Sequence, residues 1–110
     1  MTLEALKQWG ANVEEGMKRC LNNEGFYLSL VGRILPDDRL ARLEGALNEK
    51  DFTKAFELAH ALKGMYGNLS LTPLYAPISE MTELLRAKTD MDYTALLERA
   101  KEQFKKLCEL

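Results

Sequence analysis

The sequence predicts an all-α domain: an up-and-down four-helix bundle with one or two additional short helices at its N-terminal end. Apolar residues recur every three or four positions between points where Gly, Pro, Asn or Asp interrupt the pattern, as expected for helices with one buried face. The chain has no runs of β-branched residues, and its short connections favour antiparallel neighbours. With 110 residues it is expected to form a single domain, residues 1–110.

The first two predicted helices are short and begin at capping residues. A segment from Thr2 to Gln8 ends before Gly10, which suits a C-terminal cap. Asn12 begins the second segment with Glu15 three residues further on, the arrangement of a capping box. The apolar spacing predicts that the second helix buries Val13, Met17 and Leu21.

The next three helices also have recognisable starts. Asn23 is expected to cap the third helix, and Pro36 to end it because proline cannot continue the hydrogen-bond ladder. Asp37 or Asp38 begins the fourth helix, and Asp51 caps the fifth. The residues expected to face inward are Tyr27, Leu30, Val31 and Ile34 in the third helix and Leu40, Leu43 and Leu47 in the fourth.

The last two helices differ in how clearly they begin. Thr72 and Pro73 suit the N-cap and first turn of the sixth helix, but Pro77 would remove a hydrogen bond one turn later. This helix is therefore expected either to kink early or to begin near Pro77. Asp90 or Asp92 begins the last helix. Its expected inward residues are Tyr93, Leu96, Leu97, Ala100, Phe104 and Leu107.

Composition and charge exclude several classes of protein. Fifteen basic and seventeen acidic residues give a net charge of -2 without a basic run, so nucleic acid is not an expected partner. No apolar stretch is long enough to cross a bilayer and the N-terminus has no signal-peptide core, so we expect a cytoplasmic protein without membrane contact, and a monomer. Cys20 and Cys108 match no metal or redox spacing, and both are expected to be small core residues.

The only histidine, His60, lies in the stretch AHALKGMYGNLSL. On a helical projection it falls at the edge of the apolar face, where it should be partly exposed. Gly64 and Gly67 follow on the same side, although glycine in a helix costs about 1 kcal/mol relative to alanine. The missing side chain at Gly64 would leave the ring open. Lys63, at i+3, would place a positive charge beside an anion carried on the ring.

Two interpretations of this stretch stay open on these features. The chain has no Ser, Cys or second His placed to form a triad and no metal site of the usual kind. His60 therefore suits a nucleophile that accepts a phosphoryl group while the catalytic groups come from a partner. Alternatively, His60 is an ordinary surface residue, and the glycines permit close helix contact or, for Gly67, a C-cap. Lys54 and Glu57 are expected to be surface charges.

A wider resemblance favours the first interpretation. The segment Ala59-His60-Ala61-Leu62-Lys63-Gly64, followed by Gly67-Asn68-Leu69, resembles the signature of histidine-containing phosphotransfer (HPt) domains of two-component phosphorelays. GANVEEGMKRCLNNEGFYLSLVGRIL resembles the two helices before the motif, DDRLARLEGALNEKDFTKAFELAH resembles the helix and turn leading into it, and the last two helices fit as well.

The resemblance implies a phosphocarrier and not an enzyme. His60 would accept a phosphoryl group from the phospho-aspartate of one receiver domain and relay it to another, while Mg²⁺ and the catalytic residues would come from the receiver, with no cofactor of the chain's own. The implied partners are response-regulator receiver domains and a hybrid histidine kinase. Lys63 would neutralise the phosphoryl charge. The residues assigned to partner binding are Gly64, Gly67, Ala61 and Glu57.

The chain departs from the family's pattern at four positions. Met65 and Tyr66 stand where smaller residues are expected, and both are interpreted as core. Ser70 stands where glycine is frequent. Thr82 lies near where a Glu or Gln often sits close to the histidine. The alternative function is a helical adaptor or scaffold that binds signalling partners without being phosphorylated.

Overall fold

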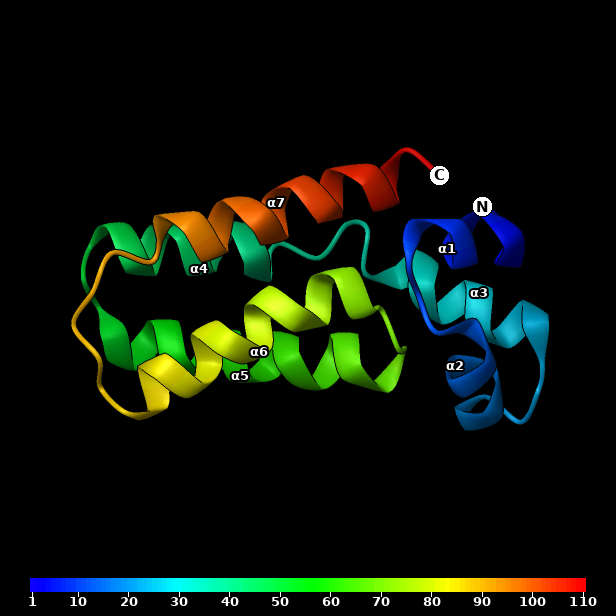
Figure 1. The fold of residues 1–110 in the computed structure, drawn as a ribbon, viewed down its shortest axis with the longest axis horizontal. Helices are drawn as coiled ribbons and strands as arrows, with labels where there is room; N and C mark the ends of the chain where they lie inside the picture. The colour runs from blue at the N-terminus through cyan, green and yellow to red at the C-terminus, as the bar shows by residue number, and fades with distance from the viewer.

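The computed structural model describes residues 1–110 and contains seven α-helices and no strand. Four of them, α4 (Arg39–Asn48), α5 (Phe52–Asn68), α6 (Thr72–Arg86) and α7 (Thr94–Cys108), form an antiparallel bundle. In Figure 1, α4 and α7 lie on one side of this bundle and α5 and α6 on the other. The predicted all-α fold with a four-helix bundle is confirmed.

The N-terminal helices pack at one end of the bundle and give the molecule an elongated shape of 41 × 24 × 20 Å (Figure 1). They are the short helices α1 (Leu3–Trp9) and α2 (Val13–Arg19), followed by the longer α3 (Glu24–Arg33). No helix in the chain combines the length and apolar character that crossing a bilayer requires.

Most helices begin where the sequence predicts, because a short polar side chain accepts a hydrogen bond from an otherwise free backbone amide. The side chains of Thr2, Asn12, Asn23 and Asp51 each accept from the amide three residues further on. At the starts of α4 and α7, an aspartate that lies just before the helix accepts a hydrogen bond from a backbone amide two residues further on. Asp37 accepts from the Arg39 amide at 2.9 Å, and Asp92 from the Thr94 amide at 2.9 Å.

Helix α6 resolves the alternative left by its prolines. It begins at Thr72, with Leu71 as the N-cap residue, and continues through Pro77. A start near Pro77 is therefore wrong. Pro77 lies close to the N-terminal end, where it removes one backbone hydrogen bond, and its ring is buried.

The core consists of 25 buried apolar residues, and the inward residues predicted for α3, α4 and α7 either belong to it or pack against it. Two predictions were wrong. Leu21 is 90% exposed because α2 ends at Arg19 and Leu21 enters the left-handed region with φ 57°, which turns its side chain away from the helix stripe. Cys108 is exposed at the last residue of α7, whereas Cys20 is a buried core residue as expected. Tyr66 is buried and Met65 packs against the core, as predicted.

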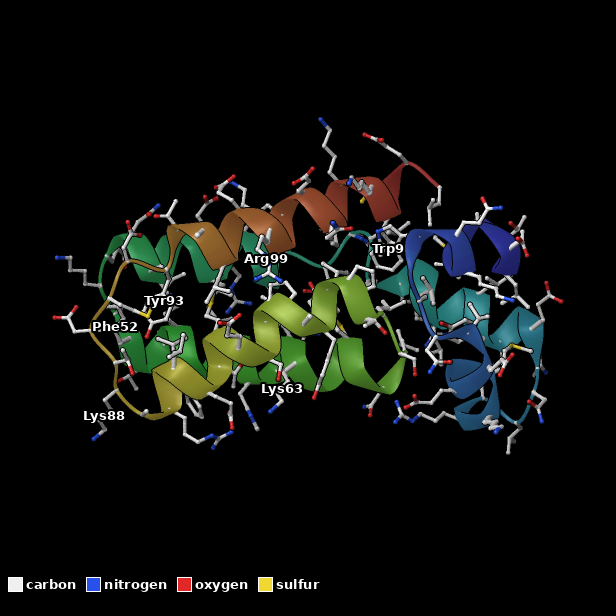
Figure 2. The ribbon with its side chains drawn as sticks, in the orientation of Figure 1. Trp9, Phe52, Lys63, Lys88, Tyr93 and Arg99 are labelled. Carbon is white, nitrogen blue, oxygen red and sulfur yellow. The ribbon has the colours of Figure 1, made fainter.

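The N-terminal helices are fastened to the bundle by polar contacts as well as by packing. The buried Tyr27 hydroxyl donates to the Leu69 carbonyl at 2.8 Å, and the Asn12 amide donates to the Ser70 carbonyl at 2.9 Å. Trp9 lies where α1 meets α7 (Figure 2), and its indole N–H donates to Gln103 Oε1 at 3.1 Å. Two of these three contacts hold the segment just after α5.

Candidate functional site

Helix α5 presents His60 to solvent. Its neighbours Ala59 and Leu62 point into the core together with Tyr66, and this arrangement fixes the rotation of the helix. His60 lies beside that buried stripe and is exposed. The predicted position at the edge of the apolar face is confirmed.

The imidazole ring has an aromatic neighbour one turn earlier on α5. The rings of Phe56 and His60 are stacked, with centroids 5.6 Å apart and planes 17° from parallel. The Arg86 guanidinium lies over the Phe56 ring at 5.0 Å. Because Phe56 also packs against the core, it restricts the orientations open to the imidazole.

The two glycines after His60 have different environments. A Cβ atom added at Gly64 would meet nothing within 4 Å, so the helix surface there is open. A Cβ atom at Gly67 would come within 3.1 Å of the Tyr75 ring on α6. Gly67 therefore permits close contact between α5 and α6, which is one of the roles that the sequence left open for the glycines.

The charged residues nearest His60 come from both α5 and α6. Lys63 Nζ lies 3.8 Å from Glu83 Oε2, and Figure 2 shows Lys63 on the side of the bundle away from α7. Arg86 Nε donates to the same Glu83 oxygen at 3.1 Å. The hydrogen bond from Arg86, with smaller contributions from the charges of Lys63 and His60, holds the pKa of Glu83 below its ordinary value. Glu83 is therefore an anion beside the histidine.

Thr82 does not reach the site, although its position in the sequence singled it out. Its side chain is buried, and its hydroxyl donates to the Ile78 carbonyl at 2.6 Å. The carboxylate on this part of α6 belongs to the adjacent residue Glu83, which pairs with Arg86 and Lys63. The sequence did not reveal this because a shift of one residue moves a side chain by about 100° around the helix, and only packing fixes that angle.

A hollow of about 570 Å³ connects His60 with the end of α5. The structure brings together four of the six predicted site residues here and leaves Ala61 and Glu57 outside the lining. The residues lining the hollow are Glu15, Arg19, His60, Lys63, Gly64, Gly67, Asn68, Ser70, Thr72 and Tyr75.

Glu15 and Arg19 enter this hollow from α2, and sequence reasoning missed both. Arg19 donates to the Gly67 carbonyl, lies 3.4 Å from the Ser70 hydroxyl and pairs with Glu15 at 2.6 Å. Ser70 has φ 57°, in the left-handed region that favours glycine. This conformation explains why glycine is a natural choice at position 70. No group of three or more His, Cys, Asp or Glu side chains is arranged to hold a metal ion.

Comparison with known families agrees with this geometry. Residues 37–109 match the family model described as Hpt domain, which spans the four bundle helices and His60. The chain belongs to the Hpt domain family. An Hpt domain is a phosphotransfer module of two-component signalling: it carries a phosphoryl group without being a catalyst, and its partners are receiver domains.

The match does not include the N-terminal helices. Residues 1–36 lie outside it, so the resemblance expected for the segment from Gly10 to Leu35 is not part of the matched region. No curated protein and no solved structure matches the chain. Of the helices outside the match, α2 alone contributes residues to the hollow beside His60, namely Glu15 and Arg19.

Proposed function

We propose that His60 accepts a phosphoryl group from the phospho-aspartate of a receiver domain and passes it to the aspartate of another. The bond between phosphorus and the aspartate oxygen breaks as a bond to an imidazole nitrogen forms, and the aspartate leaves as a carboxylate. The observation that supports this proposal is an exposed His60 beside the open surface of Gly64 in an Hpt bundle. The Mg²⁺ ion and the catalytic residues come with the receiver.

The neighbours of His60 suit this transfer. Phe56 limits rotation of the imidazole, and Gly64 leaves room for a partner to approach. Lys63 is available because its pair with Glu83 is long and solvent-exposed on the Glu83 side, and such pairs contribute about 0 to 1 kcal/mol. Lys63 therefore exchanges the Glu83 carboxylate for the phosphoryl oxygens at little cost.

The partners proposed are response-regulator receiver domains and the receiver of a hybrid histidine kinase. The test mixes the protein with a panel of receiver domains charged by a small phosphodonor in the presence of Mg²⁺. Intact mass and acid lability then report phosphate on histidine. We expect acid-labile label on the wild-type chain and none on His60→Gln with an unchanged fold. Receiver binding without phosphoryl uptake would support the adaptor function instead.

The monomeric state and cytoplasmic location stay predictions.

Replacing Lys63 tests the electrostatic part of the proposal. Lys63→Ala should slow transfer to His60 by about tenfold, the effect of losing one charge-assisted hydrogen bond. Lys105→Ala, an exposed lysine on α7 outside the hollow and on the other side of the bundle from α5, is the control and should transfer normally. Single-turnover transfer from a phosphorylated receiver measures both. Equal rates for the two variants would exclude this role for Lys63.

A further inference from the structure

Helix α2 forms one side of the hollow in which His60 lies. Glu15 and Arg19 are its two contributions to the lining. Both belong to the segment outside the Hpt match, so this wall is not part of the bundle itself.

The wall is held firmly against the end of α5. Arg19 donates to the Gly67 carbonyl, and the Asn12 amide at the start of α2 donates to the Ser70 carbonyl at 2.9 Å. Below them, the buried Tyr27 hydroxyl donates to the Leu69 carbonyl at 2.8 Å. A partner therefore meets α2 in a fixed position beside the histidine.

The dimensions of protein interfaces place α2 within reach of a partner that docks at His60. Gly67, which Arg19 contacts, is seven residues from His60 and therefore about 10 Å along the helix. An ordinary interface buries about 800 Å² on each partner, which corresponds to a patch roughly 30 Å across. A receiver domain centred on His60 with such a patch covers the wall formed by α2.

The chemistry of this wall is set by Glu15. Arg19 already uses its guanidinium on Gly67, Ser70 and Glu15. The Glu15 carboxylate accepts from Arg19 at 2.6 Å and from Asn12 Nδ2 at 3.2 Å. An ionised carboxylate has about four acceptor positions, so Glu15, whose side chain is 49% exposed, keeps free capacity.

We infer that Glu15 accepts an ion pair from a basic side chain of the receiver domain that docks at His60, and that α2 thereby selects among receivers. This inference rests on the proposed phosphotransfer function. Charges at the edge of an interface act mainly on the association rate and its salt dependence. Glu15 should therefore affect how fast a receiver is captured and leave the chemical step at His60 unchanged.

The experiment compares Glu15→Lys with Glu14→Lys. Both are exposed acidic residues in the first turn of α2, but only Glu15 lines the hollow. For the preferred receiver, Glu15→Lys should lower the kcat/KM of transfer by about tenfold at low salt, with a smaller loss at high salt. Saturated transfer should not change, and Glu14→Lys should match the wild type. Phosphorylation of His60 by phosphoramidate, a donor that needs no protein partner, should be equal in all three.

A second variant separates the partner contact from local packing. Glu15→Gln removes the charge while its one side-chain oxygen can still accept from Arg19, at the cost of the exposed bond from Asn12 Nδ2, and it should also reduce capture, by a smaller factor. If the wild type takes up phosphate from receivers and both Glu15 variants transfer like Glu14→Lys, the inference is overturned while the proposed function stands. If no receiver phosphorylates the wild type, both fail together.

Discussion

At the scale of single residues, the surroundings of His60 show which neighbours serve the fold and which do not. Phe56 packs against the core and stacks on the imidazole, so it contributes to both the fold and the site. Gly67 has a packing reason, because a Cβ atom there would press against the Tyr75 ring. Gly64 has no packing reason at all, since a Cβ atom there would meet nothing. A glycine in the middle of a helix lowers stability, and at position 64 no packing contact compensates for this loss.

Gly64 is therefore expected to separate stability from function. Gly64→Ala should raise the free energy of unfolding by about 1 kcal/mol because alanine favours the helix. Gly64→Gln should fold equally well and reduce transfer from receivers strongly, since its side chain would project into the approach path. Chemical denaturation and transfer rates measure the two effects.

Gly45 provides the matched control, because it is a helical glycine on α4 where a Cβ atom would also meet nothing. Gly45→Ala should stabilise the chain to a similar degree, and Gly45→Gln should leave transfer unchanged. A loss of stability in Gly64→Ala, or normal transfer by Gly64→Gln, would contradict the expected role.

At the scale of helices, the end of α5 depends on the N-terminal helices for its carbonyl partners. Leu69 and Ser70 follow the helix, and their carbonyls accept hydrogen bonds from Tyr27 and from the Asn12 amide. The adjoining α2 and α3 fit closely: a Cβ atom at Gly16 would lie 2.5 Å from the Tyr27 ring. Gly16 is thus a position where only glycine lets the two helices meet as they do.

Removing the Tyr27 hydroxyl tests this connection. Tyr27→Phe should lower the free energy of unfolding by about 1 to 3 kcal/mol, because the buried Leu69 carbonyl loses its partner. Tyr75→Phe is the control, since the Tyr75 ring packs against Gly67 while its hydroxyl makes no hydrogen bond to the protein. Urea titration followed by circular dichroism measures both variants. Equal stabilities would show that the Tyr27 hydrogen bond contributes nothing.

Helix starts could be predicted from the sequence because their signals are local. Asn12, Asn23 and Asp51 act on amides three residues away, so their effect needs no knowledge of the tertiary fold. The wrong prediction that Leu21 is buried also has a local cause, the left-handed conformation of its backbone. A residue other than glycine in that conformation has no clear sequence signal. Pro77 was ambiguous because burial of its ring, which only the fold reveals, offsets the lost hydrogen bond.

The site residues also differ in whether local sequence signals could predict them. The residues on α5 could be predicted because helical spacing alone places Lys63 and Gly64 beside His60. Glu15, Arg19 and Glu83 come from other helices, and their approach depends on how α2 and α6 rotate and pack against α5. No spacing along the chain encodes that rotation.

At the scale of the whole molecule, two buried tyrosines connect the parts of the fold. Tyr66 lies in the bundle core, and Tyr27 joins the N-terminal helices to the end of α5. Burial raises the pKa of Tyr27 to about 12, and it raises the pKa of Tyr66 still further. Both must therefore stay protonated for the native packing to persist.

The pH dependence of stability follows from these pKa values. An unfolded tyrosine has a pKa of about 10, so the folded chain binds the proton more tightly than the unfolded chain does. The contribution is fully present below pH 10 and is lost as pH rises through 10 toward 12. We expect the melting temperature to fall over this interval, and to fall less steeply in Tyr27→Phe. Thermal scans from pH 8 to 12 provide the check, and identical slopes for the two chains would contradict it.

The position of Trp9 gives this chain a built-in optical reporter. The sequence contains one tryptophan, and its indole is fixed between α1 and α7 by the bond to Gln103, away from the hollow at His60. Its intrinsic fluorescence therefore follows the attachment of the N-terminal helices, whereas circular dichroism follows helix content throughout the chain. Coincident melting curves from the two signals would indicate one cooperative unit. An earlier fluorescence change would mean that α1 detaches from α7 while the bundle that carries the histidine is still folded.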